Sequence, residues 1–263
     1  MRTVPARNGW LWLLKGFALF RKSPAMWSFL VFTYWIAVAL LGQIRYVGPA
    51  ASTVLLPAFS VSFMVMCAVL DRGGMLQPAL LLSGFRQRPS TLIALGGLYL
   101  LAIVVVLGIT SLADSGALLR WMLSGEEPSM EAFRDGSVSR ALLLAALGGA
   151  PVLMAFWFAP VLATWNRLGA VQSLFYSFFS VWRNWRAFFV YGAAIALASA
   201  IILLALTVAA IVTRGQVQAL RFVALMFTLL LLPTVFASFY ASYRDIFPDG
   251  SGPVEPPANQ PGP

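Results

Sequence analysis

The sequence contains no histidine and a single cysteine, Cys67. The absence of histidine excludes imidazole acid/base catalysis and histidine-based metal sites, and one cysteine cannot form an intramolecular disulfide. Charged residues make up only 10% of the chain, with 9 acidic residues against 18 Lys and Arg. The chemistry open to this chain is narrow, and we predict no catalytic residue, no metal site and no cofactor.

Apolar residues, in contrast, make up 60% of the chain and recur in runs of about 20 residues. A helix of that length crosses a hydrocarbon core of about 30 Å once. Continuous apolar runs also argue against the alternating pattern of barrel strands. The sequence predicts an all-α polytopic membrane domain over residues 1–246, with spans at about 26–41, 50–70, 91–112, 141–165, 188–211 and 222–243.

The six spans form three pseudo-repeated hairpins. In each hairpin the second span carries a proline in a similar phrase: Leu-Pro-Ala at Pro57, Ala-Pro-Val at Pro160 and Leu-Pro-Thr at Pro233. Proline inside a helix frees a carbonyl and bends the helix, which membranes tolerate where other groups satisfy that carbonyl. We therefore predict helix kinks at all three prolines. They could shape a shared cavity or only help the hairpins pack.

An amphipathic helix precedes each hairpin, and its apolar face suits the membrane surface. The clearest of the three lies before the fifth span. Its apolar stripe contains Val171, Leu174, Phe175, Phe178, Trp182 and Trp185, whereas Ser173, Ser177 and Ser180 lie off the stripe. Weaker versions precede the first span, at residues 9–20, and the third span, at residues 76–88.

Orientation follows from the distribution of Lys and Arg among the loops. On the side that carries both termini we count 12, and on the other side 6, which together give the 18 present. The positive-inside rule then predicts cytoplasmic N- and C-termini. This asymmetry accounts for nearly all of the net charge of +9, so we predict no nucleic-acid partner.

Basic and aromatic residues gather where the amphipathic helices meet the spans. These residue types suit the anionic headgroups of the cytoplasmic leaflet, and membrane lipids are the partners we expect, whereas no protein partner follows from the sequence. The candidate headgroup contacts are Arg21, Lys22, Arg86, Arg88, Arg183, Arg186, Trp182 and Trp185. The same residues could instead only enforce topology.

Three further segments have no specific chemistry. The outward loop holds Glu126, Glu127, Glu131 and Asp135 without a recognisable ligand spacing, and we interpret it as a solvated loop. The residues 247–263 are rich in Pro and Gly, and we expect this cytoplasmic tail to be disordered. Hydroxyl residues within spans, such as Ser62 and Ser238, are expected to bond backbone carbonyls rather than line a polar path.

One stretch resembles a known family. From Trp157-Phe158-Ala159-Pro160 through Ser177-Phe178 and Asn184-Trp185 to Phe188 and Tyr191-Gly192, the chain resembles uncharacterised six-span proteobacterial inner-membrane proteins. In pattern it is also similar to the membrane domain of some bacterial glycerophosphodiester phosphodiesterases. Relatives tend to have a proline where this chain reads Asn166-Arg167-Leu168-Gly169. The resemblance implies a bacterial inner-membrane location and a helical fold, and it supplies no activity.

Three hypotheses for function follow. The first is a non-catalytic membrane protein that organises lipid or accompanies a larger complex. The alternative is a transporter or channel for a small solute or lipid, with a path between the kinked helices. An intramembrane enzyme is the third, although no nucleophile and base can be named.

Overall fold

The computed structural model describes residues 1–44, 47–214 and 216–248. Most of the predicted tail, residues 249–263, lies outside the described residues. The tail was predicted to begin at residue 247, which is wrong for Phe247. That side chain is buried against the rings of Phe158 and Tyr243, because the end of the last helix directs it back into the core.

All regular structure in the described residues is helical. The helices are α1 (Asn8–Phe20), α2 (Pro24–Gly42), α3 (Val47–Asp71), the 3₁₀ helix η1 (Pro78–Arg86), α4 (Pro89–Asp114), α5 (Ala117–Ser124), α6 (Met130–Arg134), α7 (Ser137–Trp157), α8 (Ala159–Trp165), α9 (Ala170–Arg183), α10 (Trp185–Val212) and α11 (Val217–Ile246). Prolines at the first positions of α2 and α4 fit their role as helix starters.

Six helices in the described residues are long and apolar enough to cross a membrane. They are Pro24–Gly42, Val47–Asp71, Pro89–Asp114, Ser137–Trp165, Trp185–Val212 and Val223–Ile246. The prediction of an all-α polytopic membrane protein with six spans is confirmed. Each predicted span overlaps one of these helices.

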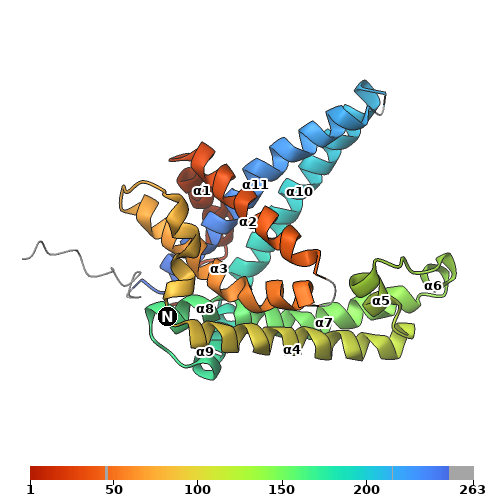
Figure 1. Cartoon of the computed structure of the whole chain (residues 1–263), viewed down its shortest axis with the longest axis horizontal. Helices are drawn as coiled ribbons and strands as arrows, with labels where there is room; N and C mark the ends of the chain where they lie inside the picture. Colours follow the sequence, from red (N-terminus) through yellow and green to blue (C-terminus); the bar gives the residue numbers. More distant parts are fainter. Residues whose placement is uncertain (45–46, 215, 249–263) are drawn as a thin grey trace, which may run out of the picture.

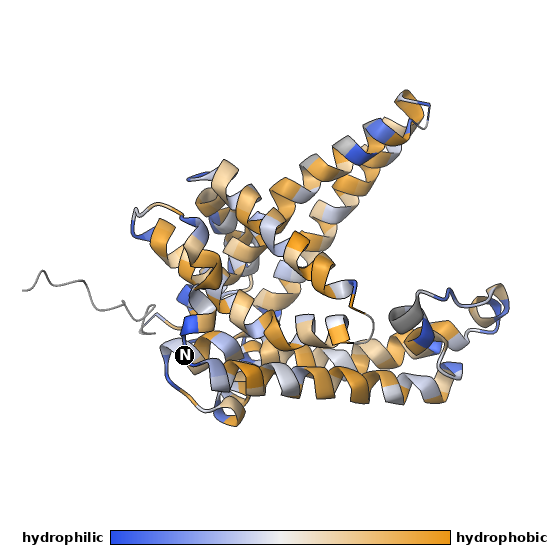
Figure 2. Ribbon diagram, viewed as in Figure 1, coloured by the Kyte–Doolittle hydropathy of each residue, from blue (hydrophilic) through white to orange (hydrophobic). Residues whose placement is uncertain are grey.

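Three hairpins, α2–α3, α4–α7 and α10–α11, diverge from one end of the molecule (Figure 1). We call this end the base. It holds the N-terminus, α1, η1, α8, α9 and the last turns of α11, whereas α5, α6 and the far ends of the paired helices form the tips. Figure 2 shows that the long hairpins are hydrophobic over most of their length, as helices surrounded by lipid must be.

The core lies at the base, and ring contacts near the three prolines form a large part of it. Phe63 of α3 stacks on Phe236 of α11, with ring centroids 4.3 Å apart. Phe158, which precedes α8, stacks on Phe239 of α11 at 5.7 Å. Packed aromatic rings thus fill the space between the three returning helices. This arrangement gives the transporter alternative no support, and that alternative stays a prediction from sequence.

Two helical predictions need correction. The segment before the third span is a 3₁₀ helix over Pro78–Arg86, which suits its short length. The predicted fourth span, 141–165, is broken at Phe158 into α7 and α8. Pro160, at the start of α8, has no N–H to donate to α7, which weakens the helix at this point. Pro57 and Pro233 instead lie inside α3 and α11.

The second and third amphipathic helices pack against the hairpin that precedes them in the chain. Helix η1 lies on α3, and α9 lies on α7 and α8. Helix α1 has no preceding hairpin, and it packs on α11 and α10 of the last one. The repeat is therefore closed cyclically, with α1 in the position that a helix after the third hairpin would occupy.

Candidate functional site

Two of the predicted headgroup cations bind backbone instead. The Lys22 ammonium donates to the Leu70 carbonyl at 2.9 Å, near the end of α3. The Arg88 guanidinium donates to the carbonyls of Ala163 and Leu168, both at 2.8 Å, around the end of α8. Carbonyls at helix C-termini lack intrahelical partners and carry partial negative charge, so cations stabilise them. Each cation thereby joins the start of its hairpin to the end of the returning helix.

The other four predicted cations are exposed at the base. The Arg21 guanidinium lies 5.4 Å from the centre of the Phe17 ring. The Arg186 guanidinium lies 5.5 Å from the Trp185 ring, on the first turn of α10. Arg86 and Arg183 are exposed as well. The structure therefore divides the predicted set into backbone-bound and outward-facing cations.

Helix α9 turns its aromatic side outward. Trp182 and Trp185 are 59% and 58% exposed, and the Trp182 ring stacks on Phe178 at 6.1 Å. The serines that lie off the stripe, Ser173, Ser177 and Ser180, are fully buried against the protein. The hydroxyl face thus contacts the hairpin because small side chains allow close packing, and the apolar face is left for the surrounding membrane.

Ser177 joins α9 to the break in the fourth span. Its hydroxyl donates to the Met154 carbonyl at 2.8 Å and accepts from the Phe158 N–H at 2.8 Å. In a continuous helix these two backbone groups would bond each other. One side chain inserted into the helical ladder therefore satisfies both groups, a recognised cause of helix breaks. Sequence reasoning missed this role, although Ser177 was part of the resembling stretch.

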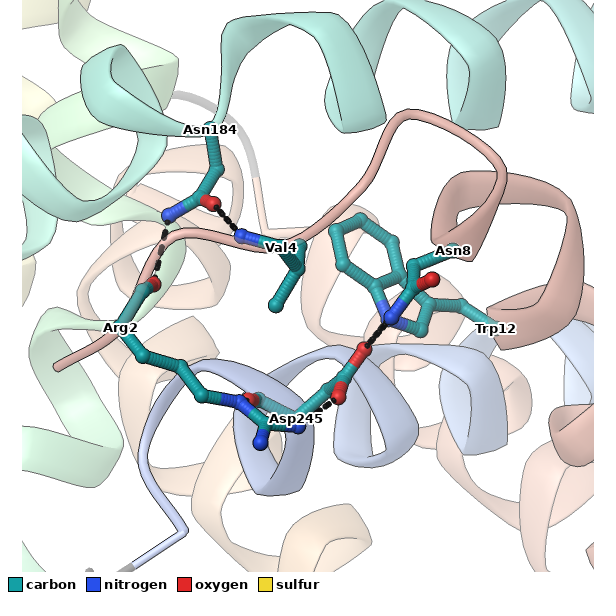
Figure 3. Close-up of polar contacts among 6 residues, drawn as sticks. All are labelled: Arg2, Val4, Asn8, Trp12, Asn184 and Asp245. Carbon is teal, nitrogen blue, oxygen red and sulfur yellow. Dashed lines mark hydrogen bonds and ion pairs between the residues drawn. The ribbon is translucent and has the colours of Figure 1, made fainter.

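The N-terminal segment is fastened across the base by Asp245 (Figure 3). The Asp245 carboxylate accepts from the Arg2 guanidinium at 2.5 Å, from the Asn8 amide at 2.6 Å and from the Trp12 indole at 2.9 Å. The Arg2 Nε also donates to the Asp245 carbonyl at 2.6 Å. Only 7% of the Asp245 side chain is exposed. Burial of its charge would cost free energy without these partners.

Asn184 holds the same segment from the other side. Its side-chain oxygen accepts from the Val4 N–H at 2.8 Å, and its amide donates to the Arg2 carbonyl at 3.2 Å (Figure 3). This residue stands between α9 and α10, so the segment bridges that junction and the end of α11. Asn184 was singled out only within the resembling stretch, and Asp245, which directly follows Arg244, carried no local signal for the contact.

Hydroxyl groups within the spans bond carbonyls of their own helices, as predicted. Ser62 donates to Ala58 at 3.1 Å, and Ser238 donates to Val235 at 2.7 Å. Both also join neighbouring helices, since Ser62 accepts from the Gly84 N–H and the Ser238 hydroxyl lies 2.6 Å from that of Tyr191.

Carboxylates at the tip of α4–α7 cap local turns. Asp114 accepts from the Gly116 and Leu118 N–H groups. Asp135 accepts from the Ser137 N–H at 2.8 Å, and this bond, with the Ser137 hydroxyl and the Arg140 charge, lowers the pKa of the Asp135 carboxyl. Among the described residues no group of three or more Cys, Asp or Glu side chains is arranged to hold a metal ion.

Six apolar spans, outward-facing aromatic residues and polar groups that bond the chain's own backbone define an all-α, multi-pass membrane protein. Over 253 residues the chain is 36% identical to a probable inner membrane protein of Burkholderia thailandensis, and the match covers 93% of this chain and 92% of that relative. The chain belongs to the family of this inner-membrane protein. No protein-family model and no solved structure matches it.

The likeness to the membrane domain of glycerophosphodiester phosphodiesterases is not shown by these comparisons, and it stays a prediction.

Proposed function

We propose that the chain is a non-catalytic lipid-organising protein, which gathers anionic phospholipids around its base. The outward face of the α9–α10 junction carries the proposal. There Trp182, Arg183, Trp185 and Arg186 are all exposed, while the serine face of α9 is turned into the protein. The exposed side is thus the one with affinity for lipid.

The Trp and Arg residues at this junction suit the membrane–water interface and the anionic lipid surface, respectively. Indole rings are amphipathic and favour the membrane–water interface. Each Arg near an anionic surface contributes about 1 kcal/mol of attraction. In this proposal Arg86, on η1, extends the same charged rim, and the 12 to 6 distribution of Lys and Arg supports a cytoplasmic base, where anionic lipids attract polybasic segments.

Two features favour an organising role over catalysis. Cys67 is fully buried in α3, and buried structural cysteines are inert. Asp245, the acid with the most partners at the base, is held by three donors that leave it little freedom to exchange protons with a substrate.

The test measures lipid retention by the full chain. A triple variant, Arg86→Gln, Arg183→Gln and Arg186→Gln, is placed in nanodiscs of phosphatidylethanolamine and phosphatidylglycerol. Native mass spectrometry then counts the phosphatidylglycerol that stays bound after release. We expect a loss of about tenfold or more, since three cations of about 1 kcal/mol each are removed. The base keeps 12 − 3 = 9 cations against 6, so the topology should hold.

A matched control removes the same charge from the tips. Its substitutions are Arg134→Gln, Arg214→Gln and Arg221→Gln, all at exposed positions. This control should retain phosphatidylglycerol as the unchanged protein does. Equal retention by both variants and the unchanged protein would show that the base cations only set topology, and the proposal would be wrong.

A further inference from the structure

An apolar groove runs along the last hairpin on the tip side of α1. It encloses about 280 Å³, which is near the lower end of the roughly 300–1,000 Å³ of ligand pockets. Helices α1, α10 and α11 form its walls, whose lining includes Trp10, Leu14, Phe17, Ala198, Ile202 and Leu230.

The groove lies within the span-forming part of α10 and α11, so its natural surroundings are lipid chains. Helix α1 crosses beneath it. The backbone of α1 is pressed against both helices there, since a Cβ on Gly9 would lie 2.1 Å from the Ala187 carbonyl oxygen and one on Gly16 2.5 Å from that of Thr234. This close fit fixes the position of the α1 wall of the groove.

One cation, Arg21, lies just after the last residue of α1, next to a wall residue of the groove. Arg21 follows Phe17 by four residues and Leu14 by seven, which places the three on one side of the helix. Its guanidinium lies 5.4 Å from the ring of Phe17, a wall residue. Helix α1 contains no acidic residue. The groove therefore has an apolar body and a positively charged end.

Shape alone would not hold a lipid in this groove. Lipid tails are as apolar as the groove wall, so a chain entering it gains no hydrophobic free energy over the bulk bilayer. An attraction at the headgroup would make one lipid preferred, and Arg21 supplies a charge complementary to a phosphate.

We propose that the groove holds one acyl chain of an anionic phospholipid whose phosphate contacts Arg21. This inference rests on the proposed lipid-organising function, and it assigns that function a specific binding position at α1. The site differs from the rim of Arg86, Arg183 and Arg186, so each can fail alone.

The experiment uses phosphatidylglycerol with a diazirine in one acyl chain. The full chain in nanodiscs with this lipid is irradiated, and the cross-linked residues are mapped by mass spectrometry. Cross-links should concentrate on the groove walls of α10 and α11, at residues such as Ile202 and Leu230. Unlabelled phosphatidylglycerol should compete more effectively than unlabelled phosphatidylcholine.

Two variants test the groove and its cation separately. Ala198→Phe fills the groove and should abolish cross-links to its walls, whereas Ala200→Phe, on the opposite face of α10, should leave them unchanged. Arg21→Gln should lower the yield with phosphatidylglycerol about fivefold, the factor that one cation near an anionic lipid contributes. Arg21→Lys keeps the charge and should restore the yield.

Cross-links spread evenly over the three hairpins, without selective competition, would overturn the inference even if Ala198→Phe failed to fold. Equal yields for Arg21→Gln and the unchanged protein would also overturn it. If the groove result holds while the rim variant retains its lipid, the proposed rim is wrong and the groove stands; the reverse pattern leaves the rim and removes the groove.

Discussion

Ser177 shows how one hydroxyl decides the course of a membrane span. It occupies both backbone groups, Met154 C=O and Phe158 N–H, that would otherwise close a helical turn. In Ser177→Ala both groups lose their partner inside an apolar core. We expect a loss of about 1–3 kcal/mol in the free energy of unfolding, measured by tryptophan fluorescence during denaturation in detergent.

The control for this variant is Ser139→Ala, at an exposed serine of α7. It should change the stability by less than about 0.5 kcal/mol. An unchanged stability for Ser177→Ala would mean that α7 and α8 close into one helix when the hydroxyl is removed.

Also at the residue scale, Asp245 fastens the N-terminal segment. In Asp245→Asn the charge that Arg2 pairs with is lost, and bonds to charged groups contribute about 1.5–3 kcal/mol each. We expect faster tryptic cleavage after Arg7 in the variant than in the unchanged protein. Asp135→Asn, at an exposed tip carboxylate, should leave that cleavage rate unchanged.

At the scale of elements, glycines allow the amphipathic helices to lie against the spans. A Cβ on Gly84 of η1 would lie 1.9 Å from the Ala58 carbonyl oxygen, and one on Gly16 of α1 would meet Thr234 and Ser238. Ala58 and Thr234 each follow a proline directly, while Ser62 and Ser238 stand five residues after one. The two contacts therefore repeat at matching positions of the first and third hairpins.

Alanine at these glycines should separate the elements. We expect Gly16→Ala to lower the midpoint of thermal unfolding, because α1 must move away from α11. Gly97→Ala in α4 is the matched control, since a Cβ there meets nothing within 4 Å. That change should stabilise α4 slightly, as alanine favours a helix over glycine by about 1 kcal/mol. Similar losses for both variants would argue against the close contact.

Small residues four positions apart often allow close packing between helices, but those of α10 face away from the protein. Gly192, Ala196 and Ala200 form one face of α10, yet all three are exposed, and a Cβ on Gly192 would meet nothing within 4 Å. This face does not pack against the described part of the chain, because α1 and α11 contact α10 on its other sides.

On the scale of the whole molecule, base and tips should face opposite compartments. In a Cys67→Ser background, Glu127→Cys at a tip should react with a membrane-impermeant maleimide added to intact spheroplasts. Gln77→Cys, exposed at the base, should react only after the membrane is opened. The reason is the excess of Lys and Arg at the base, which disfavours its translocation. The opposite labelling pattern would show that the predicted orientation is wrong. It would also contradict the proposed contact between the base and the lipids of the cytoplasmic leaflet.

The sequence by itself determined the six spans, the amphipathic helices and the three proline positions. These features follow from local rules, since a bilayer demands apolar runs of fixed length and a helix repeats its faces every 3.6 residues. Their prediction needs no knowledge of what lies beside each helix.

Only the tertiary structure decided which groups meet across the chain. It placed α1 on the last hairpin, inserted Ser177 into the fourth span, turned Lys22 and Arg88 onto helix ends and joined Arg2 to Asp245. The last two residues are 243 positions apart in the sequence. Such contacts depend on how the hairpins pack at the base, because local periodicity gives the face of a helix but not its neighbour.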